Sequence, residues 1–213
     1  MPQLLRIDSS ADVAGSVSRA LTDAFVAAWT GRGDDHTVVV RDLHRDPLPH
    51  LPDPALHWAP RLRVEGATPP AAAVALQDEL IAELSAADAV VIGAPMYNYS
   101  LPSSLKAWVD YIHVPGVTAT FDDQPSRPVE GRPVVLVSSR GASYDPGTPT
   151  AEWDHTIAPL QLVLGESLGM GVHVVTSALT LADSVPALAE FRERAHAERA
   201  AAEEQLRELA LSF

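Results

Sequence analysis

Serines gather after the first apolar run of the chain, and they could bind an anion. Ser9 and Ser10 follow that run directly, and Ser16 and Ser18 open the next helical pattern. The N–H groups at a helix start and the helix dipole favour a phosphate, to which hydroxyls add neutral donors. G-x-G-x-x-G and Walker A patterns, which hold dinucleotides and nucleoside triphosphates, are absent at this turn. We therefore expect a monophosphate here, with helix capping by Ser16 as the simpler alternative.

Two further loops follow apolar runs and could hold a flat ring. Pro95–Pro102 contains Met96, Tyr97, Asn98 and Tyr99. The thioether and the aromatic rings can wall a planar heterocycle, and the Asn98 amide can bond its edge. A loop folded onto the core, without a ligand, is the alternative. The small residues of the other loop, at 138–143, allow close backbone approach, or they form a plain turn. Together the loops predict a mononucleotide with a flat ring.

The elements that must position these loops follow from the hydrophobic pattern. Short apolar runs, typical of strands buried on both faces, occur at 3–7, 37–40, 89–94, 133–137 and 172–175. Helical spacing occurs at 17–28, 76–84, 105–112, 157–168 and 186–209. Five alternating units predict a flavodoxin-like α/β fold, with a parallel sheet in the order 2-1-3-4-5 and helices on both faces. Ligands bind such sheets at the carboxyl ends of the strands.

The length suits one domain, and two segments interrupt its regular pattern. We expect residues 1–213 to form a single domain, with irregular excursions at about 43–70 and 113–132. The first excursion holds seven prolines and three histidines. In the two excursions five apolar residues are expected to be exposed, because they lie on loops: Leu56, Trp58, Val114, Val117 and Phe121.

Composition excludes several classes of function. With 15 Lys and Arg against 28 Asp and Glu, the chain has a net charge of −13 and no basic stripe for nucleic acid. It has no cysteine, which excludes disulfides, thiolate catalysis and Cys-based metal sites. Neither a signal sequence nor an apolar run of about 20 residues occurs, so we expect a cytoplasmic protein with no membrane partner.

Two motifs compete with the mononucleotide interpretation. Gly165–Gly169 matches G-x-S-x-G and would make Ser167 a hydrolase nucleophile, but that motif needs a strand before the serine and a helix after it. Here a helical pattern precedes Ser167 and a strand pattern follows, so a hydrolase is an unfavoured alternative. His44, His50 and His57 lack the spacing of a metal site, and no metal is expected.

The same loops resemble the FMN-dependent azoreductase family over nearly the whole chain. The resemblance rests on the serines already described and on Ala94–Tyr99, Leu105–Lys106, Gly116–Thr118 and Ser139–Gly141. It implies a flavodoxin-like homodimer that uses FMN and NAD(P)H to reduce quinones or azo compounds by a ping-pong mechanism. FMN itself would carry the hydride chemistry, so no catalytic side chain is expected.

The resemblance also implies roles for individual residues. The cofactor-binding positions would be Ser10, Ser16, Val17 and Ser18 for the phosphate and ribityl end, Pro95, Met96, Tyr97, Asn98 and Tyr99 for the ring, and Ser139, Arg140, Gly141 and Ala142 for its polar edge. The substrate pocket would involve Ala119, Phe121 and Glu166. Val17 and Ala142 differ from the glutamine and glycine frequent in the family, and Ala119 replaces an aromatic residue, which would widen the pocket. A flavodoxin-type FMN electron carrier is the second alternative.

Overall fold

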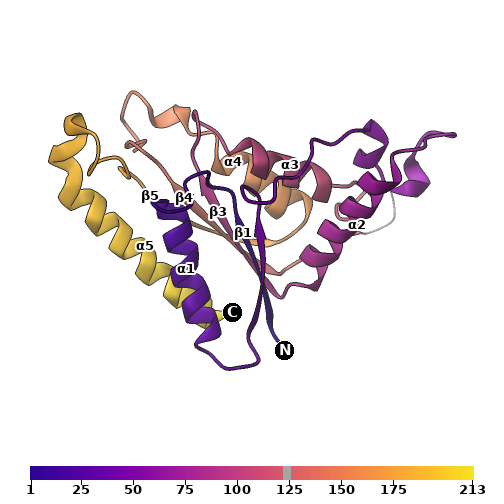
Figure 1. The fold of residues 1–213 in the computed structure, drawn as a ribbon, viewed down its shortest axis with the longest axis horizontal. Helices are drawn as coiled ribbons and strands as arrows, with labels where there is room; N and C mark the ends of the chain where they lie inside the picture. Colours follow the sequence, from indigo (N-terminus) through magenta and orange to yellow (C-terminus); the bar gives the residue numbers. More distant parts are fainter. Residues whose placement is uncertain (122–125) are drawn as a thin grey trace.

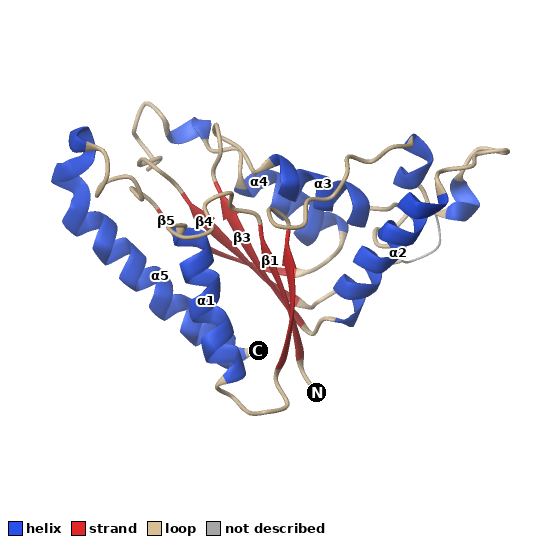
Figure 2. Ribbon diagram, in the orientation of Figure 1, coloured by secondary structure: helices blue, strands red, loops and turns tan. Residues whose placement is uncertain are grey.

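The computed structural model describes residues 1–121 and 126–213, which form a parallel sheet between two layers of helices (Figures 1 and 2). The strands are β1 (Gln3–Asp8), β2 (Thr37–Asp42), β3 (Ala89–Pro95), β4 (Pro133–Ser139) and β5 (Gly171–Ser177). Their order is β2-β1-β3-β4-β5, all neighbours are parallel, and the predicted order 2-1-3-4-5 is confirmed. The part of the expected second excursion at 122–125 lies outside the described residues.

The strands are apolar throughout because each one serves two cores. Leu5 and Ile7 of β1 point into a core shared with the helices of one face, whereas Leu4 points into the core on the opposite face. Val90 and Val91 of β3 divide in the same way. This alternation follows from the two-residue period of a strand.

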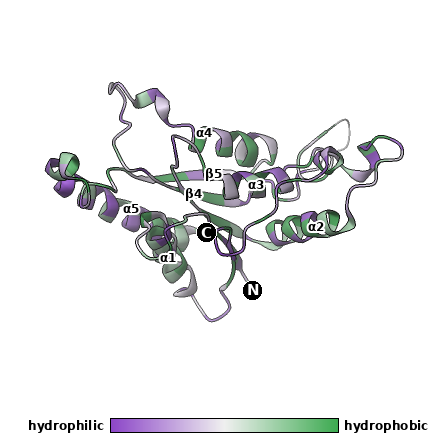
Figure 3. Ribbon diagram, turned by 45° about the horizontal axis from the view of Figure 1, so that its top comes forward, coloured by the Kyte–Doolittle hydropathy of each residue, from purple (hydrophilic) through white to green (hydrophobic). Residues whose placement is uncertain are grey.

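Helices cover both faces of the sheet. The α-helices are α1 (Val17–Thr30), α2 (Ala71–Ala86), α3 (Ser103–Ile112), α4 (Ile157–Leu160) and α5 (Arg192–Ser212). Figure 1 shows α1 and α5 side by side on one face, and α2, α3 and α4 on the other. In Figure 3, α2 is largely hydrophobic in colour, whereas α5 mixes hydrophobic and hydrophilic residues. Among the helices described, none has the length and apolar character needed to cross a bilayer.

Two predicted helices differ in detail from the structure. The expected helix at 157–168 is α4 followed by a π-helical segment, η4 (Gln161–Ser167), in which the Leu168 N–H donates to the Val163 carbonyl at 2.9 Å. This wider turn keeps both Leu164 and Leu168 fully buried. The expected helix at 186–209 begins as the 3₁₀ segment η5 (Pro186–Phe191) before α5.

The first excursion is partly folded, and the expected exposure is wrong for Leu56 in this excursion and for Val114 and Val117 in the second. It contains the 3₁₀ segments η1 (Pro54–His57) and η2 (Pro60–Leu62). Leu56 is 0% exposed and Val114 is 1% exposed, whereas Trp58 and Phe121 are each 40% exposed. The expected exposure also fails for Val117, which is only partly accessible.

A buried glutamine attaches the first excursion to the helices beside it. The Gln77 amide on α2 donates to the Leu56 carbonyl at 2.9 Å and to the Tyr111 carbonyl at 3.0 Å. The excursion is thereby attached to α2 and α3, and Leu56 packs inside. Such contacts between distant segments are invisible to a local sequence pattern.

Candidate functional site

A cleft of about 620 Å³ lies at the carboxyl ends of the strands, where the fold predicts a ligand site. Its walls come from the turn after β1, the start of α1, the loops after β3 and β4, the segment after β5, and α5. The lining residues are Ser10, Asp12, Gly15, Ser16, Val17, Pro95, Met96, Tyr97, Ser139, Gly141, Ser177, Ala178, Leu179, Thr180, Leu181, Asp183, Ser184, Ala195, His196 and Arg199. Three predicted loops therefore meet in one cavity.

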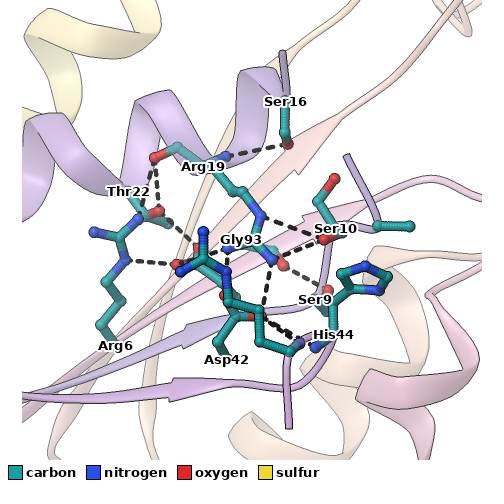
Figure 4. Close-up of polar contacts among 12 residues, drawn as sticks. Arg6, Ser9, Ser10, Ser16, Arg19, Thr22, Asp42, His44 and Gly93 are labelled. Carbon is teal, nitrogen blue, oxygen red and sulfur yellow. Dashed lines mark hydrogen bonds and ion pairs between the residues drawn. The ribbon is translucent and has the colours of Figure 1, made fainter. Parts of the chain in front are cut away.

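The turn after β1 is held by the guanidinium of Arg19 on α1 (Figure 4). Arg19 donates through Nε and Nη2 to the Ser10 carbonyl, at 3.3 and 2.8 Å, and through Nη1 and Nη2 to the two oxygens of Asp42, at 2.7 and 2.8 Å. Ser9 adds a second attachment, because its hydroxyl donates to the Gly93 carbonyl of β3 at 2.7 Å. Ser9 and Ser10 are each 2% exposed. The turn is therefore fixed before any ligand binds.

The Arg19 network also places a second carboxylate in the interior. Asp8, at the end of β1 and 3% exposed, accepts from Arg6 Nε at 2.7 Å and from the Thr22 hydroxyl at 2.9 Å. Hydrogen bonding to Arg19 lowers the pKa of Asp42 to about 2. Buried Asp8 and partly buried Asp42 are each paired with an arginine, which offsets the cost of removing a charge from water.

Hydrogen-bond donors face the cleft at this turn. Ser16 is the N-cap of α1, and its hydroxyl accepts from the Arg19 N–H at 3.3 Å and lies 3.0 Å from the Ser18 hydroxyl. The Ala11 N–H donates to the Tyr97 hydroxyl at 2.8 Å, and Ser10 Oγ lies 3.2 Å from the same oxygen. The Ala11 N–H and the Ser10 hydroxyl thus meet at one oxygen, beside the unbonded N–H groups that a first helical turn presents. This donor set fits a phosphate.

The loop after β3 places only part of the predicted ring-binding segment in the cleft. Pro95, Met96 and Tyr97 line it, whereas Asn98 and Tyr99 form an exposed turn with φ angles of 48° and 71°. The Tyr97 N–H donates to the Ser100 carbonyl at 2.8 Å, and the Ser100 N–H donates to the Tyr97 carbonyl at 3.1 Å. Left-handed backbone at two consecutive residues, one of them a tyrosine, is strained, and such strain is concentrated at functional sites.

The loop after β4 is similarly divided. Ser139 and Gly141 line the cleft, but Ala142 does not. Arg140 turns to Asp154, with 2.5 Å between the charged atoms, and its buried Nε has no partner among the described residues. An ion pair across the 143–155 segment therefore competes with the predicted cofactor contact of Arg140.

The predicted substrate residues lie away from the cleft. Ala119 is 3% exposed and packs in the core, so its small side chain does not widen this cavity. Phe121 packs edge-to-face on Trp58, with 5.3 Å between ring centroids, beside a separate hollow. Glu166 is exposed on η4, and its carbonyl accepts from Arg127 at 2.9 Å. The cleft and these three residues are not brought together within one subunit.

Ser167, the nucleophile of the hydrolase alternative, has a histidine beside it but lacks the required order of strand and helix. Ser167 Oγ lies 2.7 Å from His113 Nε2, and burial lowers the pKa of that histidine, helped by the nearby His57. Ser167 ends a π-helical segment, however, and strand β5 follows it, so the strand–serine–helix order is reversed. In residues 1–121 and 126–213 no group of three His, Asp or Glu side chains could hold a metal ion.

The sequence interpretation missed one wall of the cleft. Residues 177–184 follow β5, and His196 and Arg199 come from α5. The available signal was the rule that ligands bind beyond the carboxyl ends of strands, which applies to β5 as it does to β1, β3 and β4.

The comparisons with known proteins identify the family. A family model described as a flavodoxin-like fold matches residues 2–208, and the chain belongs to that family. A protein of Kineococcus radiotolerans is 55% identical over 210 residues, which cover 99% of each chain. A protein of Streptomyces avermitilis is 43% identical over 96% of this chain and 93% of its own. Both are named FMN-dependent NADH:quinone oxidoreductase, and the chain belongs to the same family as these relatives.

Solved structures agree with this assignment at the level of the fold. An azoreductase from Bacillus anthracis str. Sterne superposes with a TM-score of 0.82 at 23% identity, and the match covers 100% of each chain. An FMN-dependent NADH-azoreductase from Bacillus anthracis str. Ames Ancestor, solved in complex with FMN, has a TM-score of 0.78 at 19% identity and covers 99% of this chain and 100% of its own.

The Arg19–Asp42 pair predicts a pH-dependent stability. The Asp42 pKa lies at about 2, below the usual 3.8, so its pairing stabilises the fold above about pH 4 and is lost as the pH falls toward 2. Asp42→Asn should therefore lower the free energy of unfolding by about 2 kcal/mol at pH 7, and the difference from wild type should vanish near pH 2. Urea unfolding across this range measures it, with exposed Asp78→Asn as the control. A pH-independent difference would contradict the assignment.

Proposed function

We propose that this chain is an FMN-dependent oxidoreductase that transfers hydride from NADH to quinones or azo compounds. The observation that supports this most is the cleft. It combines hydroxyl and N–H groups near Ser10 and Ser16, which can bind a phosphate, with a loop at Met96 and Tyr97 that can bind a ring. The names of the relatives that share 55% and 43% identity with nearly the whole chain support the same cofactor, donor and acceptor.

The residues proposed to hold FMN divide by the part of the molecule they would meet. Ser10, Ser16, Val17 and Ser18 would bind the phosphate and ribityl end, Pro95, Met96, Tyr97, Asn98 and Tyr99 the ring, and Ser139, Arg140, Gly141 and Ala142 its polar edge. Ser18, Asn98, Tyr99, Arg140 and Ala142 do not line the cleft, so their contacts require local movement or binding through the backbone. When bound, FMN would supply two-electron hydride transfer.

The chain itself would position the reactants. Arg19 keeps the phosphate turn in one conformation, and the hairpin-like bonds of Tyr97 and Ser100 do the same for the ring loop. Met96, Leu179 and Leu181 add apolar surface to the wall of the cavity. Because one cleft would serve donor and acceptor in turn, we propose that the donor product leaves before the acceptor binds, which is a ping-pong order.

The main test separates a reductase from an FMN electron carrier. Denatured protein should release FMN and not FAD, and the holoprotein should oxidise NADH with a quinone when no redox partner is added. Double-reciprocal plots at several quinone concentrations should be parallel. Release of FAD would refute the cofactor, a need for a partner would favour the carrier, and intersecting lines would refute the ping-pong order alone.

The serines of the phosphate turn give a second test. Ser10→Ala and Ser16→Ala each remove a hydroxyl facing the cleft, and a hydrogen bond to a charged group contributes about 1.5–3 kcal/mol. We expect the FMN affinity of the apoprotein to fall about tenfold or more in at least one of them, with the fold intact. Fluorescence titration measures this, with exposed Ser103→Ala as the control. Unchanged affinity in both variants would leave the turn as a helix cap only.

We also propose a homodimer in which the second subunit completes the substrate pocket. Trp58, Val64 and Phe121 are exposed and line an apolar hollow of about 690 Å³, which a monomer would leave in water. Ala119, Phe121 and Glu166 lie apart from the cleft of their own subunit, so any substrate role for them needs a partner's cleft.

NADH does not cross membranes, and a cytoplasmic enzyme would have direct access to it.

Sedimentation tests this assembly. The protein should sediment as a dimer at micromolar concentration, and Phe121→Glu should shift it toward the monomer by placing a charge in the apolar hollow. Trp153→Glu is the matched control, because Trp153 is an exposed aromatic residue outside the hollow. A wild-type monomer, or equal effects of the two substitutions, would contradict this proposal without affecting the cofactor.

A further inference from the structure

The wall of the cleft formed by residues 177–184 and α5 was not predicted from the sequence. Among the described residues that line the cleft, it holds the only arginine or lysine. Arg199 lies on α5, in the same cavity as Ser10 and Ser16 of the phosphate turn. Figure 1 shows that α5 runs beside α1, with the starts of both helices toward the same edge of the sheet. A cation on α5 and the predicted phosphate-binding turn therefore line the same cleft.

Each charged group of the cleft has a polar partner, Arg199 included. The Asp12 carboxylate accepts from the N–H groups of Ala14 at 3.1 Å and Gly15 at 2.7 Å, within its own turn. Asp183 lies 3.0 Å from His196 Nε2. Arg199 Nε is 3.4 Å from Glu203 on the next turn of α5, and with its side chain 44% exposed Arg199 has access to solvent.

A phosphate monoester at the turn would need a counter-charge. Such a group carries nearly two negative charges at pH 7, and this chain has a net charge of −13. The turn supplies neutral hydroxyls and backbone N–H groups. Arg19, the nearest arginine in sequence, points away from the cleft and binds Asp42 and the Ser10 carbonyl. The turn therefore offers shape and donors but no positive side chain.

We propose that Arg199 is a further cofactor-binding residue, which supplies the counter-charge for the FMN phosphate from the opposite wall. His196 lies three residues earlier on the same face of α5 and also lines the cleft. This inference rests on the proposed function, because it takes FMN as the ligand of the cleft. The pyrophosphate of NADH has related chemistry, and the experiment distinguishes the two sources.

The test compares FMN with riboflavin, which has the same ring but no phosphate. Apoprotein titrations should show that Arg199→Ala lowers FMN affinity about tenfold at low salt, that Arg199→Glu lowers it further, and that neither changes riboflavin affinity. The FMN loss should shrink as salt is added, because exposed charges are screened. Arg207→Ala is the matched control, since Arg207 also pairs with Glu203 but lies outside the cleft.

The possible outcomes separate this inference from the proposed function. If wild-type apoprotein binds neither FMN nor riboflavin, the proposed function itself fails. If wild type binds FMN and Arg199→Ala binds it equally well, only the role of Arg199 fails. Equal losses for FMN and riboflavin would show a structural role and overturn the proposal. An increased KM for NADH with unchanged FMN affinity would instead assign Arg199 to the donor.

Discussion

The bidentate pair between Arg19 and Asp42 is the interaction on which the candidate site depends. Arg19 comes from α1 and Asp42 from the end of β2, and the same guanidinium binds the carbonyl of Ser10 after β1. One side chain thus fixes the spatial relation of a helix start, a strand end and a turn. Ser10 and Ser16 are held in a fixed geometry because Arg19 binds protein groups and not the ligand.

That division of work explains the charge arrangement of the cleft. The buried carboxylate of Asp8 and the partly buried one of Asp42 require arginines, and Arg6 and Arg19 meet that requirement behind the turn. Positive charge for a ligand must then come from elsewhere in the fold. The segment after β5 and the face of α5 that carries Arg199 form the wall that can provide it. With Arg199 in its proposed role, the arginines that serve the structure and the one that serves the ligand lie on different walls of the site.

The sequence predicted the sheet order and the position of the cleft because both depend on local patterns. Buried strands are apolar runs, and Ser10, Met96 and Gly141 follow three of them. The burial of Leu56 could not be predicted in this way, because the segment around it is attached to Gln77, which is far away in the sequence. The Arg140–Asp154 pair and the cleft position of Arg199 likewise arise from tertiary contacts that no single segment encodes.

A crystal structure of the protein grown with FMN tests the central claim most directly. We expect one flavin in the cleft of each subunit, with its phosphate oxygens within about 2.5–3.2 Å of the hydroxyls of Ser10 and Ser16 and its ring against Met96. Density for the flavin in the apolar hollow at Trp58 and Phe121, or a phosphate held away from the turn after β1, would contradict it.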